Sequence, residues 1–152
     1  MIYASRKQPR HGTNLVEFAL VGNVVFLLFL GLVIGGMGIF RYQEVASLAR
    51  EGSRWACVHG AQYQSDTGYS AATPADVYNN VIVPRAVGLD LNQLTYSVTW
   101  NTDNHPYHAV IASGDVVPVT NTVTVSITYQ WIPEAYLGGI TLTSSSTVPM
   151  SY

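Results

Sequence analysis

The chain lacks the features of a disulfide-stabilised, nucleic-acid-binding or hydrolytic protein. It has one cysteine in 152 residues, Cys57, so no disulfide can form within the chain. From Val58 onward Arg85 is the only basic residue against six acidic ones, a formal charge of −5, and this excludes a basic nucleic-acid footprint. No G-x-S-x-G motif, Gly-rich phosphate loop or pair of active-site carboxylates occurs. We therefore expect no enzyme and no cofactor.

Charge is also absent from a long apolar run. Phe18 to Phe40 are 23 residues without a charged side chain. As a helix, at about 1.5 Å per residue, they reach about 35 Å, enough to cross a hydrocarbon core of about 30 Å. A cleaved secretory signal has a shorter apolar region, usually about 7–15 residues, so we expect a retained membrane helix. Arg6, Lys7 and Arg10 precede it, and this positive charge predicts a cytoplasmic N-terminus, a single pass and an extracytoplasmic remainder.

The chain divides into three predicted parts. Residues 1–12 form a short basic leader, and residues 13–57 form one long helix with a membrane span at about 18–40 and an amphipathic half at 41–57. Apolar residues recur at helical spacing in that second half, at Val45, Leu48, Ala49 and Ala56. Gly60 and the polar run "AQYQSDTGYSAAT" are expected to end the helix. Residues 58–152 then form a small extracytoplasmic domain.

This domain is predicted to begin with a second helix. Thr73 is a good N-cap, Pro74 fits the first helical position, and Asp76 favours the positive end of the helix. Pro84 is expected to kink or stop the helix, and Gly88 to terminate it. Its apolar face comprises Val77, Val81, Ile82 and Ala86.

Alternating runs of β-branched and aromatic residues fill the rest of the domain. Residues 94–100, 121–131 and 140–148 predict an antiparallel sheet of about three strands with one buried face, and residues 101–120 predict a long connection. The predicted fold is therefore α+β: a long transmembrane and amphipathic helix, followed by a helix and a sheet.

A single acid stands at the start of the apolar run, in "GTNLVEFALVGNV". One explanation is that Glu17 sits at the cytoplasmic boundary and reaches the lipid headgroups. The other uses its neighbours: if a peptidase cut after Gly12, the new amine of Thr13, with a pKa near 8, would lie about one helical turn from Glu17. The residues alone leave both explanations open.

Two segments resemble the TadE-like minor pilins and pseudopilins of tight-adherence systems, which build Flp-type type IV pili. "GTNLVEFALV" is similar to a class III prepilin leader junction, with a glycine, four residues and Glu17-Phe18 before an apolar run. "YQEVASLAREGSRWA" is similar to the family's "AREGARYA" signature beyond the membrane helix. The family pattern also implies a β-rich C-terminal part such as residues 94–148.

The resemblance implies a function in pilus assembly and adhesion. A prepilin peptidase would cleave between Gly12 and Thr13, and Glu17 and Phe18 would then act in assembly with other pilin subunits and the assembly machinery. The protein would lie in the inner membrane and could enter an extracellular pilus. The resemblance also favours contacts of the cluster Arg50, Glu51 and Arg54 with the globular part or a neighbouring subunit. From composition alone, that cluster is a solvated helix face.

Other features carry weaker signals. Gly31 and Gly35 have a small-xxx-small spacing that permits close helix packing, although glycine is common in membrane helices. Asp103, His105 and His108, and also Cys57 with His59, lack structural-zinc spacing, so no metal is expected. The alternative function is a signal-anchored, single-pass protein whose outer domain binds a ligand or envelope partner, and an uncleaved leader would distinguish it.

Overall fold

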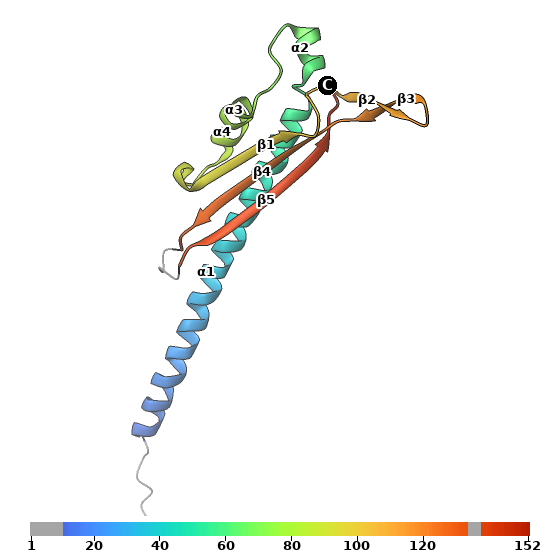
Figure 1. Ribbon diagram of the computed structural model, residues 1–152. Coiled ribbons are helices and arrows are strands. Elements are labelled where there is room, and N and C mark those ends of the chain that lie inside the picture. The colour runs from blue at the N-terminus through green and yellow to red at the C-terminus, as the bar shows by residue number, and fades with distance from the viewer. Residues whose placement is uncertain (1–10, 134–137) are drawn as a thin grey trace, which may run out of the picture. The chain divides into compact units, whose positions relative to one another are not determined.

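The computed structural model describes residues 11–133 and 138–152, with side chains from residue 14 onward. Of the expected leader, residues 1–10 lie outside the described residues. The chain separates into two units, residues 1–37 and 38–152, which are described in turn. The predicted α+β fold is confirmed: one long N-terminal helix is followed by a small domain of short helices and antiparallel strands (Figure 1).

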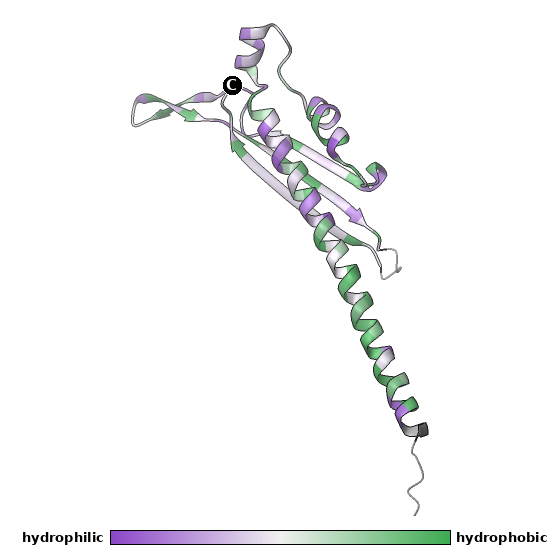
Figure 2. Ribbon diagram, turned by 180° about the vertical axis from the view of Figure 1, so that it is seen from behind, coloured by the Kyte–Doolittle hydropathy of each residue, from purple (hydrophilic) through white to green (hydrophobic). Residues whose placement is uncertain are grey.

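The first unit consists of the beginning of helix α1, His11–Cys57. Between residues 14 and 37 no side chain is buried, and large apolar groups are widely exposed, including Leu15 at 71%, Phe18 at 77% and Leu32 at 74%. The ribbon in Figure 2, coloured by hydropathy, shows that most residues of this helical segment are hydrophobic. Because apolar surface on this scale is unfavourable in water, the segment needs lipid or other helices around it.

The second unit begins with the remainder of α1, which is amphipathic as predicted. Val45, Leu48, Ala49 and Ala56 are all buried. The facing surface is the inner side of the sheet: Ser53 Oγ donates a hydrogen bond to Ser146 Oγ at 2.8 Å. The helix therefore supplies one wall of the core of this unit.

Three antiparallel strands form the main sheet, in the order β1-β4-β5. They are β1 Leu94–Trp100, β4 Thr122–Trp131 and β5 Ile140–Pro149, close to the predicted runs. Alternate residues of β4 are buried, namely Val123, Val125, Ile127, Tyr129 and Trp131. Figure 1 shows the three strands side by side, with α1 along one face only.

The other face of the sheet is a regular polar array. Each strand contains the pattern Thr-x-Ser-x-Thr, and the strand register aligns these positions in rows across the sheet: Thr99, Thr124 and Thr147; Ser97, Ser126 and Ser145; Thr95, Thr128 and Thr143. Hydroxyl pairs join the last two strands, with Thr124 and Thr147 oxygens at 2.8 Å and Thr128 and Thr143 oxygens at 3.1 Å. This face carries no charge. The cross-strand pairs give these hydroxyls hydrogen-bond partners within the sheet, where they would otherwise bond only to water.

The second helix starts where the capping chemistry predicts. The Thr73 hydroxyl accepts from the Asp76 N–H, while the Asp76 carboxylate accepts from the Thr73 N–H, which is a complete capping box. The helix comprises α3 Pro74–Val77, a π-helical turn η1 Tyr78–Ile82 and α4 Val83–Arg85. The widened turn ends two residues before Pro84, which cannot donate a backbone hydrogen bond, and the helix ends one residue after the proline.

Two segments that we expected to be irregular contain regular secondary structure. The run after Gly60 contains a short helix, α2 Ala61–Thr67. Residues 101–120 contain a second, two-stranded sheet, β2 Tyr107–Ala112 and β3 Asp115–Thr120. Ser113 and Gly114 turn this hairpin with positive φ angles of 55° and 91°, as a two-residue turn between twisted strands requires. Pro118 within β3 and the absence of clean alternation hid the hairpin from sequence reasoning.

The packing of α1 on the sheet predicts how truncated chains behave. A chain of residues 42–152 keeps the helical wall, and we expect a soluble, cooperatively folded monomer. A chain of residues 58–152 lacks Val45, Leu48, Ala49 and Ala56 and exposes the inner face of β4, so we expect aggregation or loss of cooperative unfolding. Size-exclusion chromatography and thermal circular dichroism test this, and equal behaviour of the two chains would show that the helical wall is dispensable.

Candidate functional site

The candidate assembly site lies at the start of α1. Glu17 is exposed, and its neighbours Val16 and Phe18 are exposed at 69% and 77%. Gly12 and Thr13 belong to the same helix. The four-residue spacing of an α-helix places the backbone nitrogen of Thr13 about one turn before Glu17, on the same helical face. A positive charge created at Thr13 would therefore lie within reach of this carboxylate, from the same chain or from an adjacent one.

Further along α1, Gly31 and Gly35 lie one turn apart. A Cβ added at either position would meet no atom within 4 Å in the described part of the chain. The helix therefore presents a flat strip on which a second helix could pack closely. Packing at this strip stays a prediction.

The cluster Arg50, Glu51 and Arg54 lies near the end of α1, where both arginines are exposed and Glu51 is half-buried. Among the described residues the only ion pair is Arg41–Glu44, at 3.2 Å and one turn of the same helix. The cluster thus faces solvent with its charges available. Its contact with a neighbouring subunit stays a prediction.

The histidine-rich connection is held by a side chain that sequence reasoning missed. Asn121 is fully buried, and its amide group donates to Asp103 Oδ1 at 2.7 Å and to the His105 carbonyl at 3.0 Å. Its amide oxygen lies 2.6 Å from His108 Nδ1. Asp103, His105 and His108 do come together, but around an asparagine at the base of the β2–β3 hairpin. Since a buried amide needs these partners, the arrangement is structural.

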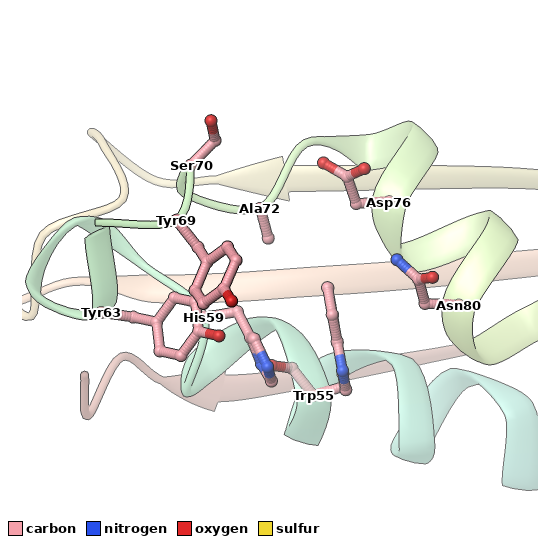
Figure 3. A pocket seen from close by; sticks show the side chains of 8 residues that line it. All are labelled: Trp55, His59, Tyr63, Tyr69, Ser70, Ala72, Asp76 and Asn80. Carbon is pink, nitrogen blue, oxygen red and sulfur yellow. The ribbon is translucent and has the colours of Figure 1, made fainter. Parts of the chain in front are cut away.

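A second feature absent from the sequence-based expectations is a pocket lined by aromatic rings, with a volume of about 490 Å³ (Figure 3). Trp55 near the end of α1 and His59 in the turn after it stack at 4.0 Å between centroids, and Tyr63 of α2 follows at 4.7 Å from His59. Tyr69 stacks on Tyr63 at 6.4 Å. The i, i+4, i+8 spacing of Trp55, His59 and Tyr63 was a usable signal, but Tyr69 joins them only through the fold.

The second helix provides the opposite side of this pocket, with Asp76 and Asn80. The hydrogen bonds from the Thr73 side chain and backbone lower the pKa of Asp76. The contribution of this group to stability is therefore full above the ordinary carboxyl pKa and is lost as pH falls through the depressed value. At neutral pH Asp76 is an anion at the edge of the rings.

These observations define the class of protein: a membrane-anchored α+β protein with one apolar helix and a C-terminal domain. Between Asn14 and Cys57 the helix is long and apolar enough to cross a membrane, and its most apolar part is not buried within the protein. The family model of TadE-like proteins matches residues 12–54, so the predicted TadE-like family is confirmed for this segment. No curated protein and no solved structure matches the chain significantly.

The family match includes the junction at Gly12 and all but the last two residues of the signature segment 42–56. Together with the apolar helix, it fits a membrane protein associated with a tight-adherence pilus. The match ends at residue 54, before the strands of the sheet.

Proposed function

We propose that this chain is a minor pilin or pseudopilin that assembles through its N-terminal helix and presents the α+β domain outside the cytoplasm. The observation that carries the proposal is the TadE-like match over residues 12–54, which contains the Gly12–Thr13 junction, Glu17 and the whole apolar segment. The role is structural, in the assembly of an Flp-type pilus used for adhesion, with no catalytic step.

The exposed apolar surface of α1 supports this role. From residue 14 to 37 the described chain buries none of its own large apolar side chains. Lipid would cover such an apolar surface in the membrane, and helices of other subunits would cover it in a filament. The strip at Gly31 and Gly35 permits the close approach that helix bundles in apolar surroundings use.

The charge pattern supports an orientation with the N-terminus in the cytoplasm of an inner-membrane protein. Arg6, Lys7 and Arg10 precede the apolar run, and the chain beyond Val58 is acidic. Positive flanks are retained on the cytoplasmic side. The partners of the protein are then a prepilin peptidase, other pilin subunits and the assembly machinery.

In this proposal Glu17 pairs with the amine of Thr13, of its own chain or of a neighbour, once cleavage has exposed that amine. An uncompensated carboxylate is costly at membrane depth, and a pair removes most of that cost. When the amine belongs to a neighbouring chain, the pair forms only at one axial offset between the two helices, and it then also fixes the register of adjacent subunits.

Cleavage is tested first. Gly12→Leu is expected to block processing, because the bulky side chain occupies the position before the cut, so the variant keeps every residue before Thr13. Intact mass of the protein purified from its native host measures this directly. Gly22→Leu is the matched control: it makes the same change where a Cβ meets nothing within 4 Å, and we expect normal processing. A wild-type mature chain that does not begin at Thr13 would overturn the prepilin assignment in favour of a signal-anchored protein.

A further inference from the structure

The aromatic pocket of the second unit has two chemically distinct sides. Rings from the end of α1, from α2 and from the following loop form one side: Trp55, His59, Tyr63 and Tyr69 (Figure 3). Asp76 and Asn80 face them from the second helix. An aromatic face opposite a carboxylate is an arrangement that the packing of the core does not require, because Tyr69 is 69% exposed and Asn80 is also exposed.

Both sides of the pocket present negative electrostatic potential. The faces of aromatic rings are electron-rich, and Trp attracts a cation more strongly than Tyr does. Asp76 is held as an anion by its capping box, which lowers its pKa. None of the eight described residues that line the pocket is a lysine or an arginine, and His59 is the one basic side chain among them. The pocket is therefore suited to positive charge and unsuited to an anion.

Asp76 has one carboxylate oxygen, Oδ1, that is available to accept a hydrogen bond from a ligand. The Thr73 N–H and hydroxyl both donate to Asp76 Oδ2, at 2.9 and 2.7 Å. Within the described part of the chain Oδ1 accepts no hydrogen bond from the protein. The bonds to Oδ2 fix the group in place, and this reduces the entropy that a ligand would have to offset.

We propose that this pocket binds an organic cation, an ammonium or guanidinium group, between the aromatic rings and Asp76. The volume of about 490 Å³ lies within the usual range for small-ligand sites, about 300–1,000 Å³. A purely apolar ligand would desolvate Oδ1 of Asp76 and the Asn80 amide without offering either of them a partner. The cation is either a free small amine or the side chain of a lysine or arginine on another protein.

The experiment is a titration of the full-length, ¹⁵N-labelled protein, with the Trp55 indole N–H as the reporter in NMR spectra. A polyoxyethylene detergent is chosen because its headgroup is neither a cation nor a sugar. The probes are tetramethylammonium, Nα-acetyl-lysine methylamide and Nα-acetyl-arginine methylamide, with glucose and acetate as neutral and anionic comparisons. We expect saturable shifts with the three cations only. Tighter binding of tetramethylammonium indicates a small free ammonium ion, and tighter binding of the amino-acid derivatives indicates a partner side chain.

Two pairs of variants separate the site from its scaffold. Tyr69→Leu is expected to weaken cation binding by about 3- to 10-fold, whereas Tyr107→Leu, which removes a ring of similar exposure from the hairpin, leaves it unchanged. Asp76→Asn and Thr73→Ala both alter the capping box, but only the first removes the charge. We expect Asp76→Asn to weaken binding about 10-fold more than Thr73→Ala does.

Three results would overturn the proposal. The first is the absence of any saturable shift with the three cations. The second is equal loss of binding in Asp76→Asn and Thr73→Ala, which would make the carboxylate a structural cap alone. The third is binding of glucose as tight as that of the cations and unchanged in Asp76→Asn, which would identify a neutral sugar site.

Discussion

Glu17→Gln is expected to leave the protein cleaved, inserted and folded outside the membrane, yet unable to assemble with its pilus. The glutamine is neutral and costs less than a carboxylate in the membrane interface, so insertion does not suffer. The substitution weakens the association of subunits, because the amine of Thr13 would then lack its counter-charge. Removing one half of a desolvated pair typically costs about 3–5 kcal/mol, a hundreds-fold loss of association or more.

The measurement combines pilus-dependent adhesion in the native host with crosslinking through the N-terminal helix. Glu44→Gln is the matched control, since it makes the same change on the same helix, where Glu44 pairs with Arg41 at 3.2 Å outside the apolar segment. Pairs of that kind are worth about 0–1 kcal/mol, so we expect normal assembly. Glu17→Asp should restore assembly only in part, because its side chain is shorter. Normal crosslinks and adhesion in Glu17→Gln would show that Glu17 only reaches the headgroups.

The elements that sequence reasoning located are those with a strong local pattern. The β4 strand alternates without interruption, so the buried set from Val123 to Trp131 follows from the two-residue period. The second helix carries Thr73, Pro74 and Asp76 in the order of a capping box, and the structure forms that box. In both cases the local preference and the global packing agree.

The elements that were missed depend on contacts between distant segments. The β2–β3 hairpin contains a proline in one strand and exposed apolar residues in both. Its sequence therefore lacks the alternation of buried and exposed residues that indicates a strand. Asn121 looks like an ordinary polar residue before a strand, and only the fold buries it among Asp103, His105 and His108. The aromatic pocket likewise forms only because Tyr69 and the second helix pack near the end of α1. No local sequence pattern predicts this contact between distant segments.

Gly60 marks the point where the end of α1 meets two other segments, and it supports the second large prediction. Its backbone N–H donates to the Tyr152 carbonyl at 3.0 Å, and the next N–H, of Ala61, donates to the Asn104 carbonyl at 2.8 Å. A Cβ at Gly60 would overlap both carbonyl oxygens and lie 2.6 Å from Met150 Cε. The methionine can move, but the two carbonyls cannot retreat without breaking the hydrogen bonds that hold them.

Gly60→Ala is therefore expected to destabilise the second unit by about 3 kcal/mol or more, from overpacking together with weakened hydrogen bonds, and to lower its thermal midpoint by roughly 10 °C. Thermal circular dichroism of the full chain in detergent measures this. Gly68→Ala is the matched control, because Gly68 has a φ of 76° but open space around it, so the substitution adds only backbone strain of about 1 kcal/mol. Equal midpoints for the two variants would mean that the segments of Asn104 and Tyr152 separate at little cost. The end of α1 would then not be fixed to the C-terminus through this glycine.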